Sequence, residues 1–153
     1  MFTRYRSLTS MLALAVGVAA LTAACGSGGG GQARRIDVRA SEFSFTPATV
    51  TLTAGTRYRL VFKNDGKTLH DWTISSIPAQ DVAEQGSGGH DMGATTMGER
   101  GMPAGNAMLH VSAEGGKSGE LTFTPTQAGE YEYECTVPGH RELGMRGRLV
   151  VQA

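Results

Sequence analysis

The chain lacks an excess of charge of either sign and contains few cysteines. Its 14 lysine and arginine residues equal its 14 aspartate and glutamate residues, and two cysteines and one tryptophan occur among 153 residues. No basic stripe with interleaved aromatic side chains is present, which argues against a nucleic-acid partner. The length favours a single domain. We therefore expect one monomeric domain that binds no nucleic acid.

The first 24 residues contain a hydrophobic run that is too short to span a bilayer. The run extends from Met11 to Ala24, whereas a spanning helix needs roughly 20 apolar residues. Arg4 and Arg6 precede it and provide the positive segment of an export signal. A buried helix with one polar face would show polar residues at a spacing of 3.6, and none occur over two turns. Residues 1–24 are therefore predicted to be a signal peptide.

Cys25 follows this run within the sequence LTAACGSGGGGQ. Small residues before a cysteine, with a glycine-rich tract after it, resemble the lipobox of bacterial lipoproteins, in which the cysteine is lipidated and becomes the mature N-terminus. Residues 25–33 would then be a lipid anchor and a flexible linker at the extracytoplasmic face of a bacterial membrane, in the periplasm or at the cell surface. The alternative is cleavage at a nearby alanine, which gives a soluble secreted protein. If Cys25 is lipidated, Cys135 has no disulfide partner, and stability must come from the core or from a metal ion.

A helical period is absent from residue 34 onward. Short segments alternate apolar and polar residues, or are rich in β-branched and aromatic residues, and turn-forming residues separate them. We expect seven or eight strands, within residues 34–40, 48–53, 57–63, 70–75, 107–113, 119–125, 129–135 and 146–152. This pattern predicts that residues 34–153 form one all-β domain, an antiparallel sandwich or barrel.

The segment GEYEYEC at 129–135 has a strict period of two. In a strand this period places three residues on the inner face: Tyr131, Tyr133 and Cys135. The outer face carries an acidic stripe: Glu130, Glu132 and Glu134. The stripe is a candidate surface for steering a basic partner, although charged strand faces are usually only solvated. Cys135 is expected to point inward at the mouth of the sandwich, and the turn after it brings His140 back over that mouth.

The segment 78–106 has no sustained period and is rich in glycine and methionine. Connections of this length without regular structure are functional or disordered, so we expect an insertion loop here. Because thioethers suit Cu(I), the loop and the strand after it could hold a weak second copper site, for which the candidates are His90, Met92, Met97, Met102, Met108 and His110. The alternative is a flexible polar loop without a metal. His110 lies within a predicted strand and is expected to be structural.

The eleven residues CTVPGHRELGM at 135–145 bring a thiol, an imidazole and a thioether into one short loop. Its proline and glycines allow a tight fold, so Cys135, His140 and Met145 can close around one ion. His70 begins the predicted strand HDWTIS and is a suitable fourth ligand. Two imidazoles and a thiolate in a trigonal plane, with a weak axial thioether, form a blue-copper electron-transfer site.

Three other interpretations of Cys135 are open. A buried cysteine is often only a small hydrophobic residue. A cysteine–histidine nucleophile needs a base oriented by a third group and an oxyanion hole, and the sequence offers no clear third member. Zinc prefers a closed tetrahedral set of cysteine and histidine ligands. The thioether of Met145 favours copper over zinc.

The segments LHDWTI and FTPTQAGEYEYECTVPGHRELGMRGRLVV resemble the cupredoxins, in particular the azurin, auracyanin and plastocyanin group. The resemblance covers most of residues 34–153 apart from the insertion. It implies an eight-stranded Greek-key sandwich and one type 1 copper ion, bound here by four residues: His70, Cys135, His140 and Met145. Azurin-like members usually have asparagine after the first histidine, where this chain has Asp71. The loop between His140 and Met145 is one residue longer than in azurins and fits the auracyanin or plastocyanin pattern better.

Asp71 and Thr136 stand where this family commonly joins its two ligand segments by a hydrogen bond. A carboxylate and a hydroxyl could make the same connection, and such contacts orient ligands and tune the metal. The alternative is a solvent-facing Asp71. Trp72 shares the face of His70 and is expected to be a core residue near the metal.

The pattern and the resemblance together favour an exported, membrane-tethered carrier of single electrons rather than an enzyme. Four ligands leave no open position for a substrate, and the chain has no second histidine cluster. His140 is the expected port for electrons, with redox partners docking beside it. The alternative is an extracytoplasmic copper-handling protein, a chaperone or scavenger that receives Cu(I) through the methionine-rich loop.

Overall fold

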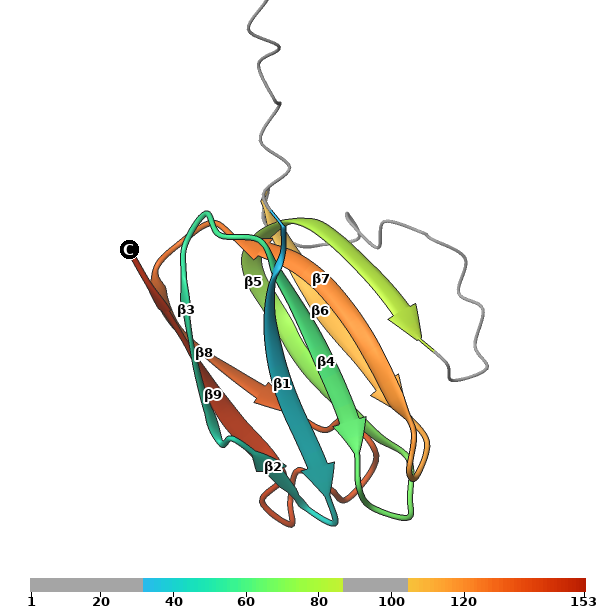
Figure 1. Cartoon of the computed structure of the whole chain (residues 1–153). Coiled ribbons are helices and arrows are strands. Elements are labelled where there is room, and N and C mark those ends of the chain that lie inside the picture. Colours follow the sequence, from blue (N-terminus) through green and yellow to red (C-terminus); the bar gives the residue numbers. More distant parts are fainter. Residues whose placement is uncertain (1–31, 87–104) are drawn as a thin grey trace, which may run out of the picture. The chain divides into compact units, whose positions relative to one another are not determined.

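The computed structural model describes residues 32–86 and 105–153, which form nine strands and no helix (Figure 1). In chain order the strands are β1 (Arg34–Ser41), β2 (Ser44–Thr46), β3 (Thr49–Thr53), β4 (Tyr58–Asn64), β5 (His70–Gly86), β6 (Asn106–Ala113), β7 (Ser118–Pro125), β8 (Gly129–Glu134) and β9 (Arg146–Gln152). Among the described residues, no helix has the length and apolar character needed to cross a membrane. The predicted signal peptide, Cys25 and all but the last two residues of the predicted linker lie outside these residues.

The strands form two sheets that share β5. The strand order is β2-β1-β4-β7-β5-β8-β9-β3, and β6 also pairs with β5. Two pairs are parallel, β1 with β4 and β3 with β9, and the others are antiparallel. Parallel neighbours need a crossover connection rather than a hairpin, so the chain crosses from one sheet to the other. The strand pairing in the sandwich is therefore mixed rather than purely antiparallel. The prediction of an all-β sandwich is confirmed.

The core of the sandwich is filled by inward-facing residues, which alternate with outward-facing residues along the strands. In β4, Tyr58, Leu60 and Phe62 are buried while the residues between them are exposed or half-buried. Trp72 is fully buried and packs against Phe123 and Tyr133, as expected for a core tryptophan. The period of two in β8 also holds, because Tyr133 and Cys135 are fully buried and Tyr131 packs partly buried against the core.

The structure contains one strand more than the eight predicted segments. The additional strand, β2, has three residues and pairs with the end of β1 as a tight hairpin, with Ser41 opposite Ser44. Three residues are too few to display an alternating period, so the sequence pattern could not reveal it.

The predicted insertion loop at 78–106 is wrong in its first part. Residues up to Gly86 continue β5 and pair with β7, from Ala79 opposite Pro125 to Gly86 opposite Gly119. A register shift between Gln80 and Ala83, with Asp81 at φ 54°, interrupts the alternation. Bulges of this kind hide a strand from a test of periodicity. The candidate second-site residues His90, Met92, Met97 and Met102 lie outside the described residues.

The two halves of β5 serve different sheets. The first half, from His70 to Pro78, pairs with β6 and places Thr73 opposite Glu134 of β8. The second half pairs with β7 in the other sheet. His70 is the first residue of β5, and Cys135 directly follows β8, so both come to the same end of the sandwich.

Candidate metal centre

The four predicted ligand residues are held by two segments at one end of the sandwich. His70 begins β5, and the loop 135–145 connects β8 to β9 and carries the other three. Cys135 and Met145, the two ends of this loop, are joined by a backbone hydrogen bond from the Cys135 amide to the Met145 carbonyl at 3.1 Å. The Met145 amide in turn donates to the carbonyl of His140 at 3.0 Å.

Two glycines give the loop its shape. Gly139 has φ 86° and Gly144 has φ 98°, values that side chains with a Cβ rarely adopt. Gly139 precedes His140, and Gly144 precedes Met145. Each positive φ therefore reverses the chain just before a candidate ligand, which agrees with the tight fold predicted for this loop.

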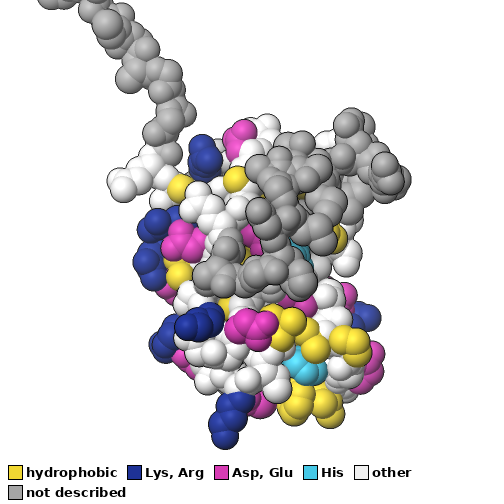
Figure 2. Space-filling model, turned by 90° about the vertical axis from the view of Figure 1, so that its right-hand side faces the viewer, with side chains coloured by type: hydrophobic (Ala, Val, Ile, Leu, Met, Phe, Trp, Pro, Cys, Tyr) yellow, Lys and Arg dark blue, Asp and Glu magenta, His cyan; other side chains and the backbone are white. Residues whose placement is uncertain are grey.

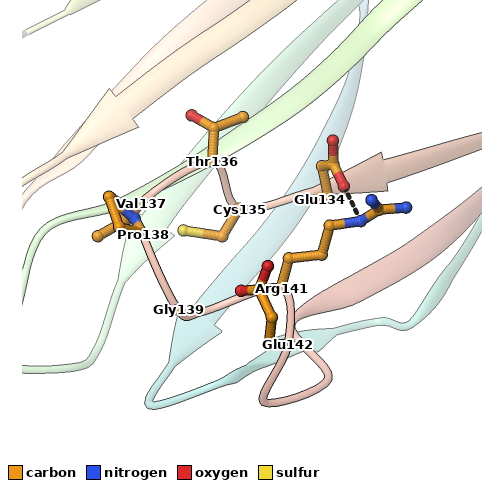
Figure 3. A pocket seen from close by; sticks show the side chains of 8 residues that line it. All are labelled: Glu134, Cys135, Thr136, Val137, Pro138, Gly139, Arg141 and Glu142. Atoms are coloured by element: carbon orange, nitrogen blue, oxygen red, sulfur yellow. Dashed lines mark ion pairs between the residues drawn. The ribbon is translucent and has the colours of Figure 1, made fainter.

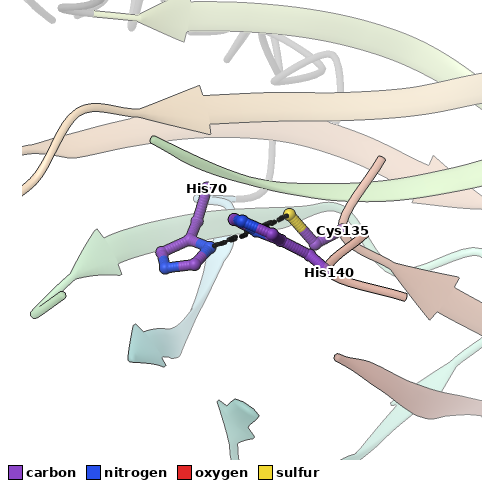
Figure 4. Close-up of side chains that lie close together, drawn as sticks. All are labelled: His70, Cys135 and His140. Carbon is purple, nitrogen blue, oxygen red and sulfur yellow. Dashed lines mark hydrogen bonds between the residues drawn. The ribbon is translucent and has the colours of Figure 1, made fainter. Parts of the chain in front are cut away.

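The donor atoms of three residues converge on one point (Figure 4). The Nδ1 atoms of His70 and His140 are 3.1 Å apart, and the Cys135 Sγ lies 3.8 Å from the first and 3.4 Å from the second. These three distances define a triangle whose centre is about 2 Å from each atom, close to metal–imidazole bonds of roughly 2.0–2.1 Å and metal–thiolate bonds of roughly 2.3 Å. The residues present therefore fit a trigonal site for one soft metal ion.

The site is buried, but not uniformly. His70, Cys135 and Met145 are fully buried, whereas His140 is partly exposed. Burial lowers the pKa of His70, and the neighbouring His140 lowers it further. Burial raises the pKa of the Cys135 thiol, and the backbone amides of Asp71 and Val137, which hydrogen-bond to it, act in the opposite direction. A His70 ring whose pKa is lowered and a thiol with two amide donors suit a site in which a cation replaces the thiol proton.

Asp71 connects the two ligand-bearing segments. Its Oδ1 accepts a hydrogen bond from the Thr136 amide at 2.9 Å, and its Oδ2 accepts one from the Thr136 hydroxyl at 2.8 Å. Only 4 % of Asp71 is exposed, so it is not the solvent-facing residue of the alternative interpretation. The start of β5 is thereby fixed to the residue that follows Cys135.

Asn64, which the sequence analysis did not single out, organises the turn that leads to His70. Its Nδ2 donates to the carbonyls of Thr68 at 2.7 Å and Ala113 at 2.8 Å, and its Oδ1 accepts from the Gly66 amide at 2.9 Å. Asn64 is fully buried. The sequence Asn-Asp-Gly at 64–66 is typical of a turn, but it gives no sign that the side chain of Asn64 is buried.

Two arginines form ion pairs with the acidic stripe on β8. Arg141 pairs with both Glu132 and Glu134, and Arg148 pairs with Glu130. Arg141 reaches back from the loop to Glu134 across an open hollow that the loop lines between Glu134 and Glu142 (Figure 3). The outward direction of the stripe was predicted, but two arginine charges offset two of its three carboxylate charges, which weakens it as a surface for a basic partner.

Hydrophobic side chains gather around a histidine at the lower end of the domain (Figure 2). Phe43, in the β1–β2 turn, contacts the His140 ring edge-to-face with centroids 5.2 Å apart. Leu143 is 61 % exposed and Leu69 is 41 % exposed, both beside candidate ligands in the chain. The sequence analysis missed Phe43 because a single exposed aromatic residue in a turn carries no periodic signal.

His110 lies in β6 and is not one of the three residues whose donor atoms converge. Its Nδ1 is 2.9 Å from the Thr73 hydroxyl, opposite it in the β5–β6 pairing. This contact agrees with the structural role expected for His110.

Comparison with known proteins identifies the family. Residues 32–152 match the plastocyanin/azurin family of copper binding proteins. The chain is 33% identical over 138 residues to the copper-resistant cuproprotein CopI of Pseudomonas aeruginosa, covering 78% of this chain and 76% of that protein. It is 31% identical over 157 residues to auracyanin-A of Chloroflexus aurantiacus, covering 92% and 94%. A solved structure of auracyanin B superposes with a TM-score of 0.55 at 27% identity, over 79% of this chain and 90% of that one. The chain, with the side chains of a type 1 copper site gathered at one end of its sandwich, belongs to the plastocyanin/azurin family of copper-binding proteins.

Proposed function

We propose that this protein is an exported, membrane-tethered blue-copper protein that carries single electrons between redox partners. The observation that supports it most is the triangle formed by the Nδ1 atoms of His70 and His140 and the Sγ of Cys135. Copper bound there supplies a one-electron couple. A site that holds both oxidation states in one geometry keeps the rearrangement on electron transfer small.

We assign four residues that would hold the copper ion: His70, Cys135, His140 and Met145. His70 is anchored by the sheet, and the thiolate of Cys135 supplies the strongest bond. Met145 is fully buried, and backbone hydrogen bonds to Cys135 and His140 hold it beside these two residues. Four protein donors leave no position for a substrate, which supports a carrier rather than an enzyme.

We propose that electrons enter and leave through the ring of His140, the one candidate ligand that is partly exposed. Phe43 contacts this ring, and Leu69 and Leu143 are exposed. We propose that these three side chains form an apolar docking surface, which we call the His140 rim. A partner can dock on an apolar surface without removing water from charged groups, which a buried ion pair would require. A redox protein with a matching apolar surface is the proposed partner.

We infer the tether from the sequence alone, because Cys25 lies outside the described residues. The short hydrophobic run, the cysteine and the glycine-rich tract support a lipoprotein at the extracytoplasmic face of a bacterial membrane. Fractionation of cells that express the full chain tests this. The wild-type protein is expected in the membrane fraction and Cys25→Ala in the soluble fraction; a soluble wild-type protein would contradict the tether.

Adding Cu(II) to the purified protein tests the site and its role together. We expect an intense blue colour and a reversible one-electron wave, both absent in Cys135→Ser because a hydroxyl does not replace the thiolate. Met145→Leu is expected to keep the colour and raise the reduction potential, because the loss of a donor atom destabilises Cu(II) more than Cu(I). Met108→Leu is the matched control, since Met108 is an exposed methionine of β6, and it should change neither property.

The second candidate function is copper handling, a chaperone or scavenger. It is favoured by the similarity to a relative that is named a copper-resistant cuproprotein. A colourless complex that forms only with Cu(I), or copper that leaves the protein on reduction, would support handling and contradict the carrier. Copper retained through repeated oxidation and reduction would support the carrier.

A further inference from the structure

Four arginines gather where β1 and β4 begin. Arg34 and Arg35 are the first residues of β1, Arg57 directly precedes β4, and Arg59 lies within β4. All four are exposed. The two strands are parallel neighbours in which Arg35 pairs with Arg59, and the Arg34 amide donates to the Arg57 carbonyl at 2.9 Å. Two segments that are distant in the chain thus form one basic surface, which we call the arginine patch.

The arginine patch carries more positive charge than its own ion pairs offset. Two of the four arginines pair with exposed or half-buried carboxylates of the sheet: Arg35 with Asp37, and Arg59 with Glu120. Within residues 32–86 and 105–153, no salt bridge involves Arg34 or Arg57. Like charges at paired positions of neighbouring strands are destabilising. An anionic partner would relieve this repulsion.

The arginine patch and the candidate metal centre lie at opposite ends of the sandwich. β1 runs from the patch to the β1–β2 turn (Figure 1), where Phe43 contacts the His140 ring. The eight residues of β1 extend over roughly 23 Å. The patch is therefore remote from the candidate ligands and takes no direct part in holding copper.

The predicted tether enters the domain at the arginine patch. Residues 26–33 separate Cys25 from Arg34. A flexible glycine-rich chain of this length has a root-mean-square span of roughly 16 Å, which is shorter than β1. A lipid on Cys25 would therefore keep the patch closer to the bilayer than the ligand-bearing end of the sandwich.

We propose that the arginine patch binds the headgroups of anionic phospholipids in the membrane that carries the tether. The inference rests on the proposed function, because the tether brings the patch to the membrane. A guanidinium group binds phosphate through two parallel hydrogen bonds as well as by charge, and each basic residue near an anionic lipid surface adds to the binding. Attached at Cys25 and bound through the patch, the domain presents His140 away from the bilayer, where a redox partner can reach it.

Binding to vesicles tests the patch separately from the tether. The Cys25→Ala protein, purified from the soluble fraction, is sedimented with vesicles of phosphatidylglycerol and phosphatidylcholine in equal parts, or of phosphatidylcholine alone. We expect binding to the first kind only, and its loss in 1 M salt, where the screening length is about 3 Å. Arg34→Gln combined with Arg57→Gln should lower the partition coefficient on the order of tenfold at low salt.

Lys67→Gln combined with Lys117→Gln is the matched control. Both lysines are exposed, and they lie in the turns before β5 and β7, at the ligand-bearing end. No salt bridge described for residues 32–86 and 105–153 involves either lysine. The same two charges are lost as in the arginine variant, but the partition coefficient should change much less. The unfolding temperatures of both variants should stay close to that of the Cys25→Ala protein, because all the altered side chains are exposed.

The outcomes are distinct. Binding to neither kind of vesicle, equal binding to both, or an equal loss in the lysine variant would overturn the proposal. Binding of a DNA duplex as tight as that of the anionic vesicles would overturn it too, because the patch would then be a general surface for polyanions. A blue wild-type protein in the membrane fraction would leave the proposed function intact in each of these cases. A wild-type protein in the soluble fraction would contradict the tether itself, and with it the orientation derived from the tether.

Discussion

Polar residues differ in burial and in the kind of contact they make between the ligand-bearing end of the sandwich and the outer face of β1, β4 and β7. At the ligand-bearing end, around the start of β5 and the loop 135–145, Asn64 and Asp71 are buried and every contact described for them is a hydrogen bond. On the outer face the polar residues are exposed and form ion pairs: Arg35–Asp37, Arg39–Asp65, Lys63–Asp65 and Arg59–Glu120.

This contrast indicates which contacts set the positions of the ligand-bearing segments. An exposed ion pair contributes about 0–1 kcal/mol, because water competes for both partners. A buried polar group that loses its partner costs about 1–3 kcal/mol, because no water replaces it. The buried contacts therefore hold the ligand segments in one geometry, and the exposed pairs contribute mainly charge balance and solubility. Adjacent residues illustrate this, since Asn64 is buried and Asp65 is exposed.

The largest effect is expected from Asn64→Ala. This change leaves the carbonyls of Thr68 and Ala113 and the Gly66 amide without their partner. We expect the free energy of unfolding of the copper-free protein to fall by roughly 3 kcal/mol, measured by urea denaturation. Asn106→Ala is the matched control, because Asn106 makes one exposed hydrogen bond to Ser76. Equal losses in the two variants would remove the proposed contrast between buried and exposed contacts.

An intermediate effect, on rate rather than stability, is expected from Leu143→Glu. Under the proposed function, electron self-exchange between oxidised and reduced copies would bring two His140 rims together, so the variant would place like charges face to face. We expect the self-exchange rate, measured by NMR line broadening in mixtures of the two forms, to fall on the order of tenfold at low salt. Thr51→Glu adds the same charge on an exposed position of β3 and should have little effect. A rate that falls equally in both would place the docking surface elsewhere.

The smallest effect is expected from Asp65→Asn on the outer face. Hydrogen bonds from Arg39 and Lys63 lower the pKa of Asp65 to about 2, below its unfolded value of about 3.9. Its contribution to stability is therefore fully present above about pH 4 and is lost as the pH falls through about 2. The variant should show a shallower loss of stability over this range in urea midpoints. High salt should reduce this effect, because it screens exposed ion pairs.

Much of this protein could be predicted from local patterns. Eight of the strands follow from alternation and turn residues, and the inward direction of Cys135 follows from the period in β8. The loop 135–145 carries three candidate ligands within eleven residues, and its glycines allow the observed turns. These features depend on residues close together in the chain, for which the geometry of a strand or a turn is sufficient.

Other features could not be predicted, because they depend on contacts between distant segments or on interruptions of a period. The bulge near Asp81 concealed the second half of β5. Phe43 reaches His140 only because the β1–β2 turn lies at the same end of the sandwich as the loop. Arg141 pairs with two carboxylates of the acidic stripe because the loop folds back toward β8.

Side-chain chemistry and short spacing are enough to predict the all-β class, the family resemblance and the residues able to bind copper. The packed sandwich is needed to bring the Nδ1 atoms of His70 and His140 within 3.1 Å of each other and to bury Asp71 between Thr73 and Thr136. Hydrogen-bond partners and burial are set by which strands pair across the sandwich. A distance between residues 65 or 70 positions apart is a property of the packed fold, since many chain paths are compatible with the same local pattern.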